Sequence, residues 1–260
     1  MQDYIPRSRS AGDQLVARKA LLRRISFYAD LDDVDQQVIM QIDGREQHYE
    51  KNTELVDAGQ EMDSVLIVKQ GWAIRYKTLE DGRRQVLNVL LPGDMFDLQV
   101  LVAAEADHSV KTVTSLTGLS VRPSEFRRLL TESGKLTLAF WWMQVQEEAF
   151  LREQIVRNGT QSARERIGHF LLELYRRVLI TGAGTDDGFR MPLTQTVIAD
   201  ALGLTPIHTN RVLRQLERDG LLERDNGWIL FKDETRLAEM SQFDPSYFHL
   251  DAFRMRLGRE

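Results

Sequence analysis

The chain has 260 residues, of which 42% are hydrophobic and 28% charged, and its formal net charge is −5. This length suits two domains, and the composition excludes a disordered chain and, for want of roughly 18 consecutive apolar residues, a membrane-spanning helix. The absence of cysteine excludes disulfides, thiolate zinc sites and cysteine-ligated iron–sulfur clusters.

The first 20 residues contain several basic side chains but lack the apolar segment of a secretory signal. We interpret residues 1–20 as a mobile arm that leads into a helix. A chain without a secretory signal and without cysteine fits a reducing compartment, so we expect it in the cytoplasm.

Residues 21–133 contain short β-like runs that alternate with turn signals. The runs 65–68, 72–79 and 85–91 end at Gln70-Gly71, Asp81-Gly82 and Pro92-Gly93-Asp94, and further alternating runs follow at 110–114 and 119–121. Many short strands at this spacing predict a sandwich or jelly roll.

Helical periodicity begins at Ser124, which can cap a short helix at the end of this unit. A long helix is predicted over residues 134–158, with Asn158-Gly159 as its stop signal. Its apolar residues occupy more than one face, so it needs two partners. We expect these to be its own β-domain and the same helix of a second subunit, and a wholly intramolecular core helix is the alternative. The predicted dimer interface comprises Leu138, Trp142, Val145, Ala149 and Val156.

Residues 159–250 are predicted to form a second domain, and residues 251–260 a tail. The domain begins with an amphipathic helix over 162–180, followed by a small polar loop. A helix-turn-helix pattern comes next: Thr194 can cap a first helix, Gly203 ends it, and Leu204 fills the turn. Thr205 then caps a second helix with Pro206 at its first position.

The second helix of this pair is amphipathic. Its predicted buried stripe is Thr209, Val212, Leu213 and Leu216. Its outward face suits a major groove, where arginine grips guanine, asparagine bonds an adenine edge and an apolar side chain contacts a thymine methyl group. Thr205 and His208, near the helix N-terminus, suit phosphates. The predicted DNA-binding residues are Thr205, Pro206, Ile207, His208, Asn210, Arg211 and Arg214.

Asn226-Gly227 follows this helix and lies between two apolar runs, which predicts a small β-hairpin. A helix-turn-helix followed by a hairpin is a winged helix. The alternative is an amphipathic helical hairpin within an all-α core.

These segments together resemble the Crp/Fnr family of transcription regulators. The resemblance rests on the runs Val65 to Gly71, Asp81 to Val86 and Leu91 to Phe96, on the stretch that begins at Ser162, and on the winged helix. It covers about 21–250 and implies an α+β fold: an N-terminal β-roll of the cyclic-nucleotide-binding type, a long dimerisation helix and a C-terminal winged helix-turn-helix. It also implies a homodimer that binds an inverted repeat of double-stranded DNA and acts with RNA polymerase.

The chain departs from the family pattern in the effector pocket. Members that bind cyclic nucleotides carry a Gly-Glu pair for the ribose and an arginine followed by a small residue for the phosphate. Here those places hold Asp97-Leu98 and His108-Ser109. The leucine side chain cannot accept a hydrogen bond from a ribose hydroxyl. Histidine lacks the permanently charged, bidentate guanidinium group of arginine, and the negative charge of an aspartate repels phosphate. We therefore expect a degenerate pocket and no control by cyclic AMP.

Other functions have weaker support in the sequence. The histidines show no metal-ligand spacing, and no nucleotide-binding or hydrolase motif is present, so we expect no metal, no cofactor and no enzyme activity. Two alternatives stay open: a regulator of the same fold that responds to haem or to an unidentified small-molecule effector, and a cupin-like metal enzyme.

Overall fold

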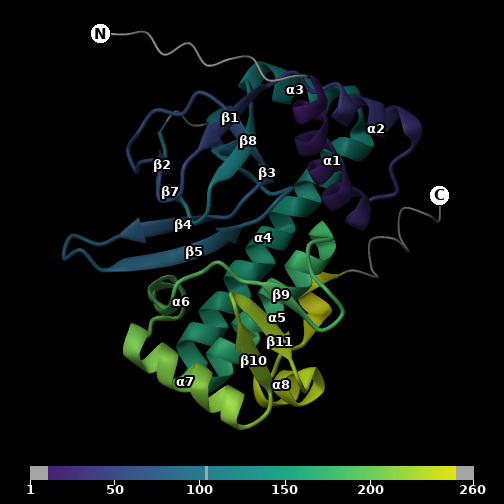
Figure 1. Cartoon of the computed structure of the whole chain (residues 1–260). Helices are drawn as coiled ribbons and strands as arrows, with labels where there is room; N and C mark the ends of the chain where they lie inside the picture. The colour runs from purple at the N-terminus through teal and green to yellow at the C-terminus, as the bar shows by residue number, and fades with distance from the viewer. Residues whose placement is uncertain (1–10, 103–104, 250–260) are drawn as a thin grey trace.

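In the computed structural model, a β-roll and its flanking helices lie at one end of a long helix, and a helical domain with a small sheet lies at the other (Figure 1). The structure describes residues 11–102 and 105–249. The predicted α+β architecture is confirmed. The predicted tail, 251–260, and residues 1–10 of the predicted arm lie outside the described residues.

The β-roll consists of two four-stranded antiparallel sheets, with strand orders β1-β8-β3-β6 and β2-β7-β4-β5. Strand β3 is apolar from Val65 to Val68 because both of its faces are covered: Val65 and Ile67 pack toward the helices, while Leu66 and Val68 pack inside the roll. The strands are β1 (Arg45–Tyr49), β2 (Glu54–Val56), β3 (Val65–Gln70), β4 (Ala73–Thr78), β5 (Arg84–Leu90), β6 (Met95–Phe96), β7 (Ser109–Thr112) and β8 (Leu116–Val121), with a short 3-10 helix, η1 (Leu98–Leu101), after β6.

Three helices cover one side of the roll: α1 (Ala11–Tyr28), α2 (Asp33–Met40) and α3 (Pro123–Glu132). Helix α1 begins inside the segment 1–20, so the predicted arm is too long; the side chain of Arg18 already donates to the carbonyl of Ile42. Helix α3 has Pro123 at its start and no side-chain cap, so the predicted Ser124 cap is wrong. Proline needs no partner for a missing N–H at this position.

Helix α4 (Gly134–Thr160) is the long predicted helix, and it continues through Asn158 and Gly159. The predicted stop at that pair is therefore wrong. The side chain of Asn158 donates to the carbonyl of Ala201 on a neighbouring helix. The break comes at Gln161, which is extended, because Ser162 and Glu165 form a capping box that starts the next helix.

The C-terminal domain contains helices and a three-stranded sheet of order β10-β11-β9. Beyond the last helix, residues 241–249 return to α4 and cover part of it: Phe248 contacts Phe150, and His249 lies against Trp142. The elements are α5 (Ala163–Thr181), β9 (Gly188–Arg190), α6 (Gln195–Leu202), α7 (Pro206–Arg218), β10 (Leu222–Asp225), β11 (Trp228–Phe231), α8 (Glu234–Met240) and the 3-10 helix η2 (Pro245–Phe248).

Buried ion pairs join this domain to the roll. Asp94, in the turn after β5, accepts a hydrogen bond from Arg177 of α5 at 3.1 Å and forms an ion pair with Arg24 of α1 at 2.8 Å. Gly93 permits the close approach, since a Cβ there would lie 2.8 Å from the carbonyl oxygen of Ala20. A second, more exposed pair, Arg84–Asp200 at 2.7 Å, fastens α6 to β5.

Candidate nucleic-acid interface

Helices α6 and α7 form the predicted helix-turn-helix. Thr194 caps α6 by accepting the N–H of Val197, and Gly203 ends it with a left-handed φ of 64°. Thr205 caps α7 by accepting the N–H of His208, and Pro206 occupies the first helical position. Each capping feature predicted for these two helices is confirmed.

One face of α7 is packed inside the domain. Its buried residues are Thr209, Val212, Leu213 and Leu216, the stripe that the sequence predicts. Burial of this stripe against α5 and α6 fixes the rotation of α7 about its axis, so the opposite face must point outward.

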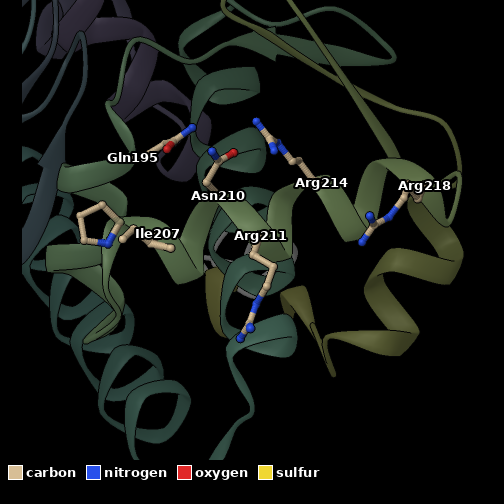
Figure 2. Close-up of a pocket in the computed structure, with 7 residues that line it drawn as sticks. Gln195, Ile207, Asn210, Arg211, Arg214 and Arg218 are labelled. Carbon is tan, nitrogen blue, oxygen red and sulfur yellow. The ribbon is translucent and has the colours of Figure 1, made fainter.

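The outward face of α7 lines a groove of about 400 Å³ (Figure 2). Among the predicted DNA-binding residues, Ile207 and Arg211 are exposed and Asn210 is half-buried. Thr205 is also exposed and His208 is half-buried, so both lie at the accessible N-terminal end of the helix. The residues that line the groove are Gln195, Pro206, Ile207, Asn210, Arg211, Arg214 and Arg218.

The groove is cationic despite the net negative charge of the chain. Within the described residues, no carboxylate forms an ion pair with Arg211, Arg214 or Arg218. Figure 2 shows the three arginines spaced along α7, with Arg211 and Arg214 pointing to opposite sides of the helix. A row of arginines without ion-pair partners on one helix face is an electrostatic surface for phosphates and base edges.

Two groove residues, Gln195 and Arg218, were not predicted. Gln195 is the first residue of α6, and Arg218 follows Arg214 by one helical turn. The spacing of Arg211, Arg214 and Arg218 at three and four residues is a signal that extends the outward face, so Arg218 could have been found from the sequence.

The predicted wing is also present. Strands β10 and β11 pair antiparallel across a turn at Asn226 and Gly227, both with positive φ. Strand β9 adds to β11, which makes a three-stranded sheet rather than an isolated hairpin. Pairing on both sides of β11 anchors the wing to the domain.

The effector region of the roll brings Asp97 and His108 together. Both are buried, and Nε2 of His108 lies 3.7 Å from Oδ1 of Asp97, while its Nδ1 lies 2.8 Å from Asp107. Leu98 begins η1, and the hydroxyl of Ser109 accepts the N–H of Ala58.

The space near this region does not suit a cyclic nucleotide. A cavity of about 160 Å³ borders Asp97, and its lining includes Glu61 and Asp63 but no lysine or arginine. On the side that faces α4, Glu147 bonds Arg75 at 2.6 Å and Asn88 at 2.7 Å, and the voids there measure about 10 and 20 Å³. Ligand pockets for small molecules are typically about 300 Å³ or more, and a phosphate needs cations.

Helix α4 exposes an apolar stripe on the side away from the roll. Leu138 is 50% exposed, Trp141 67% and Ile155 72%. Leu138 and Trp141 are three residues apart, and Ile155 follows Trp141 by 14 residues, about four helical turns. Of the predicted interface, Leu138 and Val156 are exposed and Val145 is half-buried.

The two remaining members of the predicted interface lie elsewhere. Ala149 is buried within the protomer, so its assignment to the interface is wrong. Trp142 is half-buried, with its ring 5.7 Å from that of His249. The segment 241–249 covers this part of α4, and Trp141 and Ile155 take the exposed positions instead.

Comparisons with known proteins agree with this arrangement. Residues 46–133 match the cyclic nucleotide-binding domain family, and residues 165–240 match the Crp-like helix-turn-helix domain family. A nitrogen fixation regulation protein FixK of Rhizobium meliloti is 32% identical over 67% of this chain and 76% of the relative. The FixK of Bradyrhizobium diazoefficiens is 28% identical over 76% of this chain and 82% of its own length. The solved structure of FixK2 from Bradyrhizobium japonicum is similar with a TM-score of 0.69 at 26% identity, covering 76% of this chain and 98% of that one.

The fold and the exposed face of α7 define a DNA-binding transcription regulator with a winged helix-turn-helix. The chain belongs to the Crp/Fnr family.

Among the described residues, no helix is long and apolar enough to cross a membrane.

Proposed function

We propose that this protein is a homodimeric, sequence-specific transcription regulator that binds an inverted repeat without cyclic nucleotide. Helix α7 enters the major groove, and the face lined by Asn210, Arg211 and Arg214 reads base pairs. The protein works in the cytoplasm, where its DNA and RNA polymerase are found.

The main support for this proposal is that α7 has one buried apolar face and one exposed cationic face. Its apolar stripe is fully packed, whereas its cationic face is open, and its three arginines form no ion pair with any described residue. A helix with a packed back and an open row of arginines has the form that major-groove readers share.

Dimerisation is supported by the exposed stripe of α4. Leu138, Trp141 and Ile155 are each at least 50% exposed within the described chain, and a second copy of α4 would bury this apolar surface across a two-fold axis. Two α7 helices related by that axis would contact half-sites about 34 Å apart, one turn of DNA.

Independence from cyclic nucleotides is supported by the effector region. Asp97 and His108 occupy it as a buried pair, and Glu147 closes the space toward α4. The protein therefore binds DNA either constitutively or in response to a different small effector.

The test is selection of preferred sites from random duplexes by the purified protein, without added nucleotide. We expect enrichment of an inverted repeat, and we expect cyclic AMP to change neither the sequence nor the affinity. Sedimentation velocity of the protein–DNA complex should give two chains per duplex. A footprint that forms only after addition of cyclic AMP would overturn the effector half of the proposal.

A further inference from the structure

Ile207 differs from the other residues of the α7 groove. Its side chain is 85% exposed, the second highest exposure among the large hydrophobic residues described. Apart from Pro206, the groove around it is lined by amide and guanidinium groups from Gln195, Asn210 and the arginines. Ile207 therefore has no apolar neighbour in the groove except that proline.

Its position makes this side chain part of the interface with bases. Ile207 is the second residue of α7 and stands one helical turn before Arg211. As a β-branched residue in a helix it has essentially one rotamer, so it presents a fixed surface. When the groove is filled by a duplex, Ile207 loses its water and cannot form a hydrogen bond in return.

The major groove offers few apolar groups that an isoleucine side chain could contact. Base edges there present donors, acceptors and a single apolar group, the C5-methyl of thymine. The same methyl group occurs on 5-methylcytosine. An isoleucine opposite an unmethylated cytosine or an adenine would instead face an amino group that it leaves unsatisfied.

We propose that Ile207 is a specificity-determining residue that recognises the C5-methyl group of a pyrimidine, so that the protein discriminates thymine from uracil and 5-methylcytosine from cytosine at one base pair of each half-site. The inference rests on the proposed function, because it requires α7 in the major groove. Four residues of helix rise by about 6 Å, so this pyrimidine lies about two base pairs from the guanine that Arg211 contacts.

The experiment uses matched duplexes that differ by one methyl group. In the half-site obtained by selection, each thymine is replaced singly by deoxyuracil, and affinity is measured by fluorescence anisotropy. Loss of one buried methyl contact corresponds to about fourfold weaker binding per half-site. We expect this loss at one thymine only. When that thymine is replaced by cytosine, a duplex with 5-methylcytosine there should bind about fourfold more tightly than the duplex with unmethylated cytosine.

Variants of the same residue provide the controls. Because Ile207 is exposed, its replacement should leave the fold intact, which circular dichroism can verify. Ile207→Ser should bring both affinity ratios close to one, whereas Ile207→Val, which keeps the branched apolar surface, should retain them.

The outcomes separate this inference from the proposed function. If the protein selects a specific inverted repeat but no thymine is sensitive to loss of its methyl group, the role of Ile207 is refuted while DNA recognition stands. The same holds if Ile207→Ser keeps the fourfold ratio. If no duplex is preferred at all, the proposed function fails and this inference fails with it.

Discussion

Among single residues, Arg211 carries the most specific expectation. It is exposed, unpaired within the described chain and placed in the middle of the α7 face. An arginine that bonds O6 and N7 of one guanine contributes about 1–3 kcal/mol of discrimination. We expect Arg211→Ala to lose about this much affinity for the selected site and to relax the preference at one base pair. Competition binding with single-base variants of the site measures both effects, and an equal loss on all sequences would make Arg211 a phosphate contact.

His169 gives a second expectation at this scale, through pH. Burial, followed by the nearby positive charge of Arg157, lowers the pKa of this imidazole from 6.5 to about 4. Glu173 and Tyr247 also lie close to it: Tyr247 bonds Glu173 at 3.2 Å, and its hydroxyl lies 3.3 Å from Nε2 of His169. Below pH 6.5 the unfolded chain therefore binds a proton that the folded chain does not, so stability falls as the pH falls toward 4.

We expect this single group to remove about 2 kcal/mol from the free energy of unfolding between pH 7 and pH 5. Urea unfolding at fixed protein concentration measures the change, and His169→Phe should lose that part of the pH dependence. An unaltered pH dependence in the variant would show that His169 titrates normally.

At the scale of elements, helix α4 has exposed apolar residues on one side. Ile155 and Trp141 are exposed because the roll and the segment 241–249 cover the other faces of the helix. If the proposed dimer forms through α4, we expect Ile155→Glu to convert it into monomers, since a carboxylate from each subunit would be buried in the interface. Sedimentation velocity measures this, with Val34→Glu as the control, because Val34 is also exposed (69%) but lies on α2. Equal sedimentation of Ile155→Glu and the wild type would refute the α4 interface.

The elements also show where sequence patterns suffice. The caps at Thr194, Gly203 and Thr205 were predictable because each acts on its own helix through local hydrogen bonds. The stop at Asn158-Gly159 was mispredicted because a distant carbonyl, that of Ala201, bonds the Asn158 side chain. The predicted interface also included Trp142, which instead lies against His249 from the far end of the chain. Helix caps can be predicted from the sequence because they depend on neighbouring residues. The partner of an apolar helix face cannot, because it depends on tertiary contacts.

For the molecule as a whole, Asp94 joins three parts of the structure. It pairs with Arg24 of α1 and Arg177 of α5, and the side chains of all three residues are almost fully buried. We expect Asp94→Ala to lower the free energy of unfolding by about 3–5 kcal/mol, because it removes the carboxylate that pairs with two buried arginines. Chemical denaturation measures the loss. Asp43→Ala, which removes the exposed pair with Arg122, should change stability little; equal effects of the two variants would contradict the account.

The open face of α7 should contact bases in the major groove. Methylation interference measures such contacts, since dimethyl sulfate methylates guanine at N7, the atom that Arg211 should contact. We predict one guanine in each half-site whose methylation blocks binding by the wild-type protein and no longer does so for Arg211→Ala. Binding that tolerates methylation of every guanine, or the same interference in Arg211→Ala, would contradict the claim.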